Sequence, residues 1–435
     1  MHQLTSTGLK AESLAAKAVR SCLPEGKSLP FNWDEKIRDL VVGICLSRSL
    51  QLQSIAQTRP GHVRTSENNL SALLSRKRLE MSRAQRACVV SALKRLTRRR
   101  LYKYHGKVVL IVDGTSYGKA RSRGKKKAMP GKGKVRVQNL PTDETILVPG
   151  YQEIRVGILL ADQTVLPITR RLWTENGPDC ASMNLVEEAE MRRAAEIIRE
   201  VFKLGVILVA DSGYRRKSLL HWLKKEEKMD FVIRLEGKLL IKAGRSKGLL
   251  AKLAVWWPKR FPIQWREKSK KVLLSDVSAR QISLKTESKE KFSLNAVCLT
   301  PAGGGGEPMF LATTLPIESR EDLTMIVRLY SWRWGIETFF WKFKQALGAK
   351  SWRVFSCWKA IDRLLTAAHM AYLVLVLLME FAKRGKMAAL RELMDGFEEL
   401  LYSRFARPRE EMTLGRFLRL LAMDFPSPRA AGVGL

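Results

Sequence analysis

Histidine and cysteine are scarce and scattered in this sequence of 435 residues. The five histidines have no metal-ligand spacing, and the six cysteines include no Cys-x-x-Cys pair. These absences exclude a zinc ribbon and favour buried thiols in a reducing compartment over disulfides. His221 and His369 are therefore predicted to be structural.

Long hydrophobic runs are also missing. The start, MHQLTSTGLKAESL, lacks the charged end and apolar run of a secretory signal. The most apolar segment, Leu364–Met379, is shorter than the roughly 20 residues that span a bilayer. No internal repeat indicates a solenoid. We expect a buried core helix at this segment, and a soluble cytoplasmic protein without membrane contact.

Acidic residues are few relative to basic ones. Lysine and arginine number 78 against 42 aspartates and glutamates, which gives a formal charge of +36. This excess favours a polyanionic partner, because basic side chains displace the counterions condensed on phosphates. Nucleic acid is the usual partner, although charge alone leaves a membrane surface or the ribosome open. The length predicts two or three domains.

The region before residue 105 reads as helical. Asp34–Ser47 is amphipathic, and Leu50–Gln57 is predicted to form a second, shorter helix. After a turn at Pro60-Gly61, Ser66 is predicted to cap a helix that runs to Arg78. This order is similar to a DNA-reading helix-turn-helix, and a plain helical bundle fits it equally well.

An α/β pattern follows. Val108–Val112 and Val206–Ala210 are apolar runs typical of buried strands, and they are predicted to end at Asp113 and Asp211. The other elements expected in this part are strands at Glu153–Ala161, Val165–Thr169 and Phe231–Leu235, and helices at Asn184–Phe202 and Arg215–Lys228.

Residues 236–318 interrupt this alternation. They contain short runs with strand character, separated by turns that include Gly303–Gly306. The segment therefore predicts an all-β insertion within the α/β domain, with strands at Val272–Leu274, Gln281–Leu284, Phe292–Leu299 and Met309–Thr313.

Asp113 and Asp211 share one sequence context. Each follows a predicted buried strand, and a glycine follows each within two residues. If the two strands are neighbours, the carboxylates converge at one sheet edge, where like charges require a cation. The alternative is that each aspartate caps the turn after its strand.

A third carboxylate lies in a predicted helix. Its polar residues are spaced three, four and seven apart, so they share one helical face: Tyr330, Arg333, Glu337 and Lys344. A neighbouring apolar stripe that begins at Ile336 can dock this helix on the sheet. The alternative is a solvated helix with an Arg333–Glu337 pair.

The spacing Y-x2-R-x3-E-x6-K resembles the signature of bacterial insertion-sequence transposases of the DDE class. The resemblance covers about residues 105–350. It implies that Asp113, Asp211 and Glu337 are catalytic and bind two Mg²⁺ ions, with Mn²⁺ as a possible substitute; carboxylates suit such hard cations. It also implies that Tyr330, Arg333 and Lys344 hold DNA phosphates.

The resemblance extends to the partners and the architecture. It implies a ribonuclease-H-like fold with one aspartate after the first strand, another after the fourth, and a β-strand insertion before the glutamate. The expected partners are terminal inverted repeats and target DNA, bound by a dimer in a synaptic complex.

Two further features bear on DNA. The basic stretch Lys119–Arg136 is predicted to be a mobile loop that tracks a DNA backbone through residues such as Lys125, Lys126 and Lys127, although a solvated loop is the alternative. Family members can stack a flipped base on a tryptophan of the insertion. The candidates, each of which could instead be a core residue, are Trp256, Trp257 and Trp265.

The sequence thus predicts an α/β fold: a ribonuclease-H-like catalytic core with an all-β insertion, flanked by N-terminal and C-terminal helical regions. The expected parts are residues 1–105, helical and DNA-binding; 106–235, the first part of the core; 236–318, the insertion; 319–383, the rest of the core with the catalytic helix; and 384–435, helical. The expected function is DNA transposition at the nucleoid. The alternatives are a non-enzymatic or decayed DNA-binding protein and a stand-alone nuclease.

Overall fold

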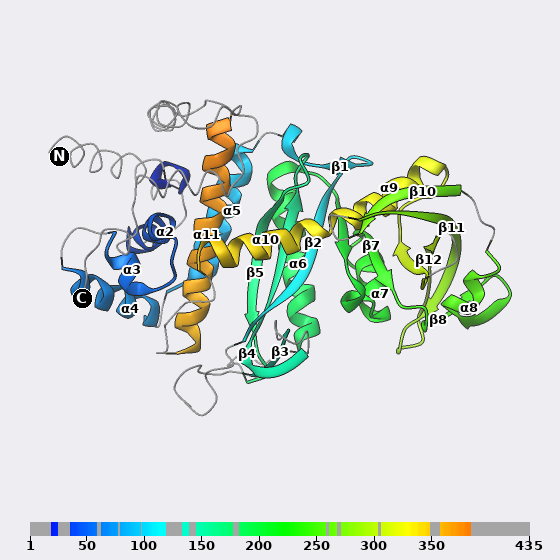
Figure 1. The fold of residues 1–435 in the computed structure, drawn as a ribbon, viewed down its shortest axis with the longest axis horizontal. Helices are drawn as coiled ribbons and strands as arrows, with labels where there is room; N and C mark the ends of the chain where they lie inside the picture. Colours follow the sequence, from blue (N-terminus) through cyan, green and yellow to red (C-terminus); the bar gives the residue numbers. More distant parts are fainter. Residues whose placement is uncertain are drawn as a thin grey trace.

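The computed structural model describes residues 19–24, 35–58, 62–76, 79–96, 98–118, 133–138, 145–176, 182–257, 261–267, 271–302, 306–348 and 357–383. In this part of the chain, N-terminal helices lie at one end of the molecule and strands at the other, with a mixed sheet between them (Figure 1). The predicted C-terminal helical region, residues 384–435, lies outside the described residues.

The N-terminal helices form a bundle. They are α2 (Glu35–Ser47), α3 (Leu52–Ala56), α4 (Val63–Ser75) and α5 (Met81–Arg95). Helices α2, α4 and α5 pack on α11 (Trp358–Lys383), and Arg363 donates to the Leu74 carbonyl across 2.7 Å. The predicted cap at Ser66 is wrong: α4 begins at Val63, and the Ser66 amide already donates to the His62 carbonyl within the first turn. Lys77 and Arg78 lie outside the described residues.

Helix α11 is the centre of this packing. Among the described residues it is the one helix long and apolar enough to cross a membrane, yet 94% of that stretch is buried inside the protein. His369, near its middle, is fully buried. The prediction of a buried core helix with a structural histidine agrees with this placement.

The described residues form one 13-stranded sheet, whose central part has its strands in the order β5-β4-β2-β6-β7. They are β5 (Val165–Trp173), β4 (Thr145–Leu159), β2 (Lys107–Gly118), β6 (Val206–Ala210) and β7 (Asp230–Leu235). Strand β4 is antiparallel to β2 and β5, whereas β2, β6 and β7 are parallel. Two helices connect parts of this sheet, α6 (Met183–Phe202) and α7 (Lys217–Lys225). The mixed α/β class is confirmed.

Strand β2 is longer than the sequence predicted. It was expected to end at Asp113, but β4 pairs with it without a break as far as Gly118 and Gly150, so Asp113 lies inside the strand. Short strand β1 (Lys103–Tyr104) pairs with its start. Part of the predicted basic loop is also a strand, because Gly133–Gln138 (β3) pairs with the first half of β4. Residues 119–132, including Lys125, Lys126 and Lys127, lie outside the described residues.

Residues 236–318 extend the same sheet. Strand β13 (Met309–Thr313) pairs with β7, β12 (Lys291–Pro301) pairs with β13, and β11 (Lys271–Lys285) pairs with β12. The two strands predicted between Val272 and Leu284 are one strand, because the intervening residues also pair with β12. The sequence did not predict the remaining elements, β8 (Leu240–Ala243), β9 (Ser246–Leu249), α8 (Leu250–Ala254) and β10 (Phe261–Glu267).

The predicted helix across Tyr330–Lys344 consists of two helices. Helix α9 (Arg320–Trp332) ends and α10 (Trp334–Ala346) begins at Arg333, which corrects the expectation of one continuous helix. The interruption coincides with a close approach to the sheet: a Cβ on Gly335 would lie 2.8 Å from the Val165 side chain. Glycine therefore allows the start of α10 to pack against β5, and α10 then lies across the strands (Figure 1).

Candidate functional site

Asp113 and Asp211 occupy level positions on neighbouring strands. The parallel pairing of β2 and β6 ends at Ile111 and Val209, and each aspartate lies two residues beyond that pair. The Asp113 carboxylate accepts from the Gly114 amide at 2.8 Å, and the Asp211 carboxylate accepts from the Gly213 amide at 2.8 Å. Adjacent parallel strands thus bring the two carboxylates to one place, as the sequence predicted, and Asp211 also caps the short helical turn Ser212–Tyr214.

Glu337 is joined to this place by Arg333. The Arg333 guanidinium donates to Asp113 Oδ2 at 3.0 Å and to Glu337 Oε1 at 3.0 Å. The Arg333 side chain is 11% exposed and that of Asp113 15%. The i,i+4 pair that the sequence offered as an alternative therefore exists, but the same arginine also binds the carboxylate on β2.

Burial makes the Asp113 carboxylate hard to ionise. It raises the pKa of Asp113 to about 7, against the opposing effect of Arg333 and with further increases from the Asp211 and Glu337 charges. Tyr214, buried in the short helical turn Ser212–Tyr214, also has a raised pKa, caused first by burial and then by neighbouring carboxylates that include Asp113 and Asp211. The charges of Asp211 and Glu337 therefore act on the buried Asp113 carboxylate.

The chemistry of these donors fits a divalent cation, because carboxylate oxygens are the ligands that Mg²⁺ and Mn²⁺ prefer. The present arrangement is not one of metal ligation. Among the described residues, no three His, Cys, Asp or Glu side chains gather as a metal site. Instead, the Arg333 cation lies between two of the acids. Metal binding would require this guanidinium to withdraw.

The remaining motif residues have different environments. Lys344 donates to the Thr115 hydroxyl on β2 and lies 5.4 Å from the centre of the Tyr117 ring. From helix α10 it therefore contacts the strand that carries Asp113, at the edge of the site. Tyr330 is only 7% exposed, and the Arg333 guanidinium lies 5.8 Å from its ring centre. The buried Tyr330 ring thus lies beside the Arg333 guanidinium in this conformation.

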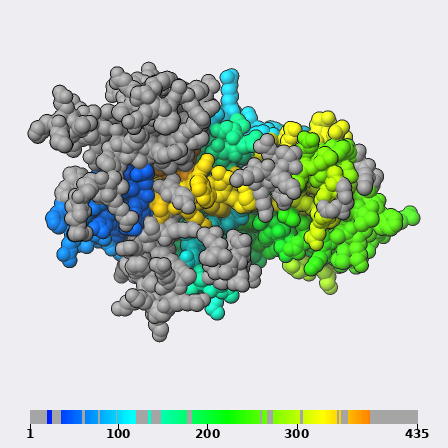
Figure 2. Space-filling view, viewed as in Figure 1, coloured from blue at the N-terminus to red at the C-terminus, as the bar shows by residue number. Residues whose placement is uncertain are grey.

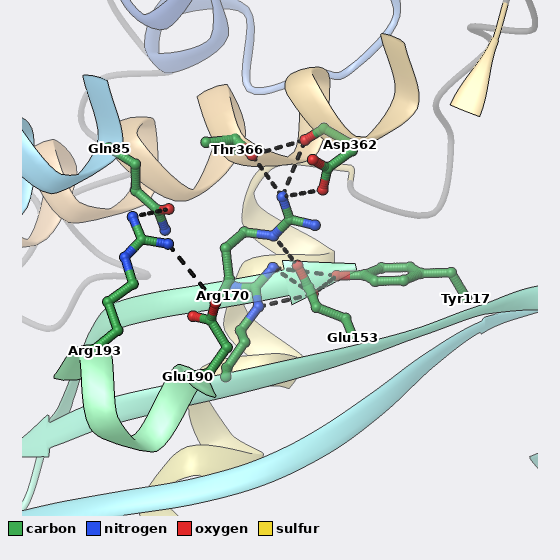
Figure 3. A network of polar contacts seen from close by, with 9 residues as sticks. Gln85, Tyr117, Glu153, Arg170, Glu190, Arg193, Asp362 and Thr366 are labelled. Atoms are coloured by element: carbon green, nitrogen blue, oxygen red, sulfur yellow. Dashed lines mark hydrogen bonds and ion pairs between the residues drawn. The ribbon is translucent and has the colours of Figure 1, made fainter. Parts of the chain in front are cut away.

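A buried polar network centred on Glu153 and Arg170 joins strands of the sheet to a helix packed on it (Figure 3). Glu153 on β4 accepts from Tyr117 at 2.6 Å and from Arg155 at 2.8 Å, and it also pairs with Arg170. The Arg155 guanidinium lies 3.8 Å from the centre of the Phe343 ring on α10. The network therefore joins the sheet to the face of α10 that lies against it.

The network continues into α11. Arg170 on β5 donates to the Asp362 carboxylate at 2.9 Å and to the Thr366 hydroxyl at 2.6 Å. Arg155, Glu153 and Arg170 are at most 3% exposed. The sequence did not predict the burial of these residues, since charged side chains are usually exposed. Their one signal is the spacing of Glu153 and Arg155, two apart, which points both to one face of β4.

The three tryptophans proposed for base stacking differ in exposure. Trp257 is 4% exposed and Trp265 is 7% exposed, with the Trp265 indole donating to Ser275 at 3.1 Å. Trp256 is 81% exposed. Of the three, only Trp256 presents its ring to solvent. The other two are core residues, which was the alternative interpretation of the sequence.

Comparison with known proteins completes the description of the site. No curated protein matches the chain. Residues 186–374 match the family model of the transposase DDE domain. The matched span contains Asp211, Arg333 and Glu337, whereas Asp113 and strand β2 precede it. This match, on a chain with a formal charge of +36, supports a transposase of the DDE class whose domain includes residues 186–374.

Proposed function

We propose that this protein is an insertion-sequence transposase that cleaves DNA at transposon ends and joins the freed ends to target DNA. The observation that carries the proposal is the level placement of Asp113 and Asp211 at the end of the β2–β6 pairing, with Glu337 linked to Asp113 through Arg333. The family match supplies the reaction class.

The proposed core is ribonuclease-H-like. The strand order β5-β4-β2-β6-β7, with β4 antiparallel to the central strand, supports this assignment, with β2 and β6 as its first and fourth strands. Residues 236–318 are proposed as the β-strand insertion, although they include helix α8 and continue the core sheet through β13. The region before residue 105 is proposed to bind DNA, and a plain helical bundle remains its alternative.

Asp113, Asp211 and Glu337 would hold two divalent ions, which supply a Lewis acid and an activated oxygen nucleophile when bound. Around them, the chain's own residues position the DNA. Arg333, once released from the two carboxylates, can donate two parallel hydrogen bonds to a phosphate. Lys344 approaches from the β2 side as a second phosphate contact, and the network beneath α10 keeps both residues in register with Asp113. Tyr330 would orient Arg333.

The proposed partners follow from this chemistry. They are the terminal inverted repeats and target DNA, with two protein copies in the synaptic complex and a cytoplasmic location at the nucleoid. Lys125, Lys126 and Lys127 remain proposed backbone contacts. Trp256 is the candidate for stacking an unpaired base, because its ring is exposed.

Cleavage of a labelled duplex that carries the terminal repeat, with Mg²⁺ or Mn²⁺, tests the proposal. The wild type is expected to cut at the repeat end, and Glu337→Ala is expected to bind the duplex without cutting. Glu307→Ala, which removes an exposed carboxylate elsewhere, serves as the matched control and should cut normally.

The other outcomes decide between the alternatives. Equal cutting by Glu337→Ala and the wild type would disprove the catalytic assignment. Binding without cutting by every variant, with paired ends present, would favour a decayed or non-enzymatic DNA-binding protein. Cutting that needs no inverted repeats and yields no joined product would favour a stand-alone nuclease.

A further inference from the structure

A cavity of about 490 Å³ lies next to Gly213, the second residue after Asp211. One wall comes from Gly213, Arg215 and Arg216, which precede α7, and from Lys217 at its start. The other includes Lys285 at the end of β11 and Thr286, which follows it. We call this cavity the α7 pocket. Its size falls in the range of roughly 300–1,000 Å³ that is usual for ligand sites. Its lining residue Gly213 also donates its amide to Asp211, so the pocket adjoins the site described above.

The pocket has positive charge that is not neutralised. Four of its residues are basic and one, Glu287, is acidic. Arg215 pairs with Glu236 at 3.0 Å, and Arg216 pairs with Glu187. In the part of the chain that the structure describes, no carboxylate lies within ion-pair distance of the remaining pair, Lys217 and Lys285. These two lysines line the pocket from two separate segments, so their positive charges are available to an anionic ligand.

The start of α7 adds backbone donors to the same wall. The residue before the helix, Arg216, makes no side-chain cap to it. The first hydrogen bond of the helix runs from the Leu220 amide to the Arg216 carbonyl, so the amides of Lys217 to Leu219 have no carbonyl partner within the helix. Helix α7 has nine residues. Its positive end, at Lys217, thus forms part of the cavity wall, an arrangement that favours a phosphate group.

The position of the pocket indicates which phosphate. Lys344 contacts β2, whereas the α7 pocket follows β6 and lies toward β11. Lys344 therefore adjoins Asp113 through Thr115, two residues further along β2, and the pocket adjoins Asp211 through Gly213, whose amide donates to that carboxylate. A DNA strand that is bound at both basic sites would pass over the carboxylates. Among the described residues, no aromatic ring lines the pocket, which suits contact with a backbone rather than with a base.

We propose that the α7 pocket binds a backbone phosphate of the DNA strand that crosses the carboxylates, through Lys217, Lys285 and the first amides of α7. This proposal rests on the proposed function. A phosphate contact of this kind positions the duplex without reading its sequence. Removal of the two lysines should therefore weaken binding of every duplex to the same extent.

The test is DNA binding by the full chain, without divalent metal, at several salt concentrations. The double variant Lys217→Gln/Lys285→Gln is compared with Lys252→Gln/Lys291→Gln, which removes two exposed lysines outside the pocket. Loss of this one phosphate contact is expected to reduce the slope of log Kobs against log salt by about 1. The control pair should leave the slope unchanged. Both a terminal-repeat duplex and a scrambled duplex should respond equally.

Three results would overturn the proposal. An unchanged slope for the pocket variant would show that no DNA phosphate binds there. An effect on the terminal-repeat duplex alone would assign the pocket to base recognition. Binding of inorganic phosphate that depends on the lysines, with DNA binding unaffected, would make it a site for free phosphate. If the wild type binds no DNA at all, the proposed function fails as well; if it binds and cuts while the variant is unaffected, only the pocket assignment fails.

Discussion

Replacement of Asp113 by asparagine should stabilise the metal-free protein, and more strongly at pH 8 than at pH 5. Burial raises the pKa of Asp113 from 3.8 to about 7. Between these values the folded protein holds a proton that the unfolded chain has released, so the free energy of unfolding falls as pH rises through this window. A shift of about 3 pKa units corresponds to about 4 kcal/mol. Asparagine is neutral at every pH and removes this penalty.

Part of that penalty is already present at pH 5, where the unfolded carboxyl is mostly ionised. The difference between Asp113→Asn and wild type should therefore be larger at pH 8 than at pH 5 by about 2–3 kcal/mol. Thermal melting in a chelator, followed by circular dichroism, would report this as a difference of several degrees in apparent Tm. Glu307→Gln, an exposed carboxylate, serves as the control. An equal change at both pH values, or a larger loss of stability at pH 8, would refute the reasoning.

The two salt bridges of Arg333 and the buried position of Arg155 give two more predictions. In the absence of DNA, the Arg333→Gln variant should bind Mn²⁺ at least about tenfold more tightly than wild type. In the wild type, the metal must displace the charge-assisted hydrogen bonds of Arg333, which are worth about 1.5–3 kcal/mol each. Electron paramagnetic resonance measures the Mn²⁺ affinity, and equal or weaker binding by the variant would contradict the prediction. Arg155→Met should destabilise the protein by about 3–5 kcal/mol, since it removes one of the cations that pair with the fully buried Glu153 carboxylate. Urea unfolding checks it, and a change under 1 kcal/mol would count against the network.

The positions of Asp113 and Asp211 could be predicted because the sequence pattern that indicates them lies in the residues directly before each aspartate. Each follows a run of apolar residues that forms a buried strand, and parallel neighbours bring such positions level. Periodicity also placed Arg333 and Glu337 on one face. It could not show that the arginine would bind Asp113, because that contact joins residues 220 apart in sequence.

The buried network was beyond the reach of the same reasoning. Arg170 finds its carboxylate partner Asp362 across 192 residues. Nothing near either residue marks it as buried, and a charged residue is predicted to be exposed unless its partner is known. The end of β2 was missed for a related reason. The strand continues through polar residues because β4 supplies hydrogen-bond partners there, not because the residues have strand character.

The pairing of β7 with β13 gives the segment between them an unusual freedom. These strands are antiparallel neighbours, with Leu235 beside Phe310, so the chain leaves the core sheet and returns to it at adjacent positions. In topological terms, the whole of residues 236–308 is the connecting loop of a β-hairpin. Such a loop can lengthen, shorten or be exchanged during evolution while the register of the strands that carry Asp113 and Asp211 stays the same. The wall of the α7 pocket that β11 supplies belongs to this exchangeable part, whereas the carboxylates do not.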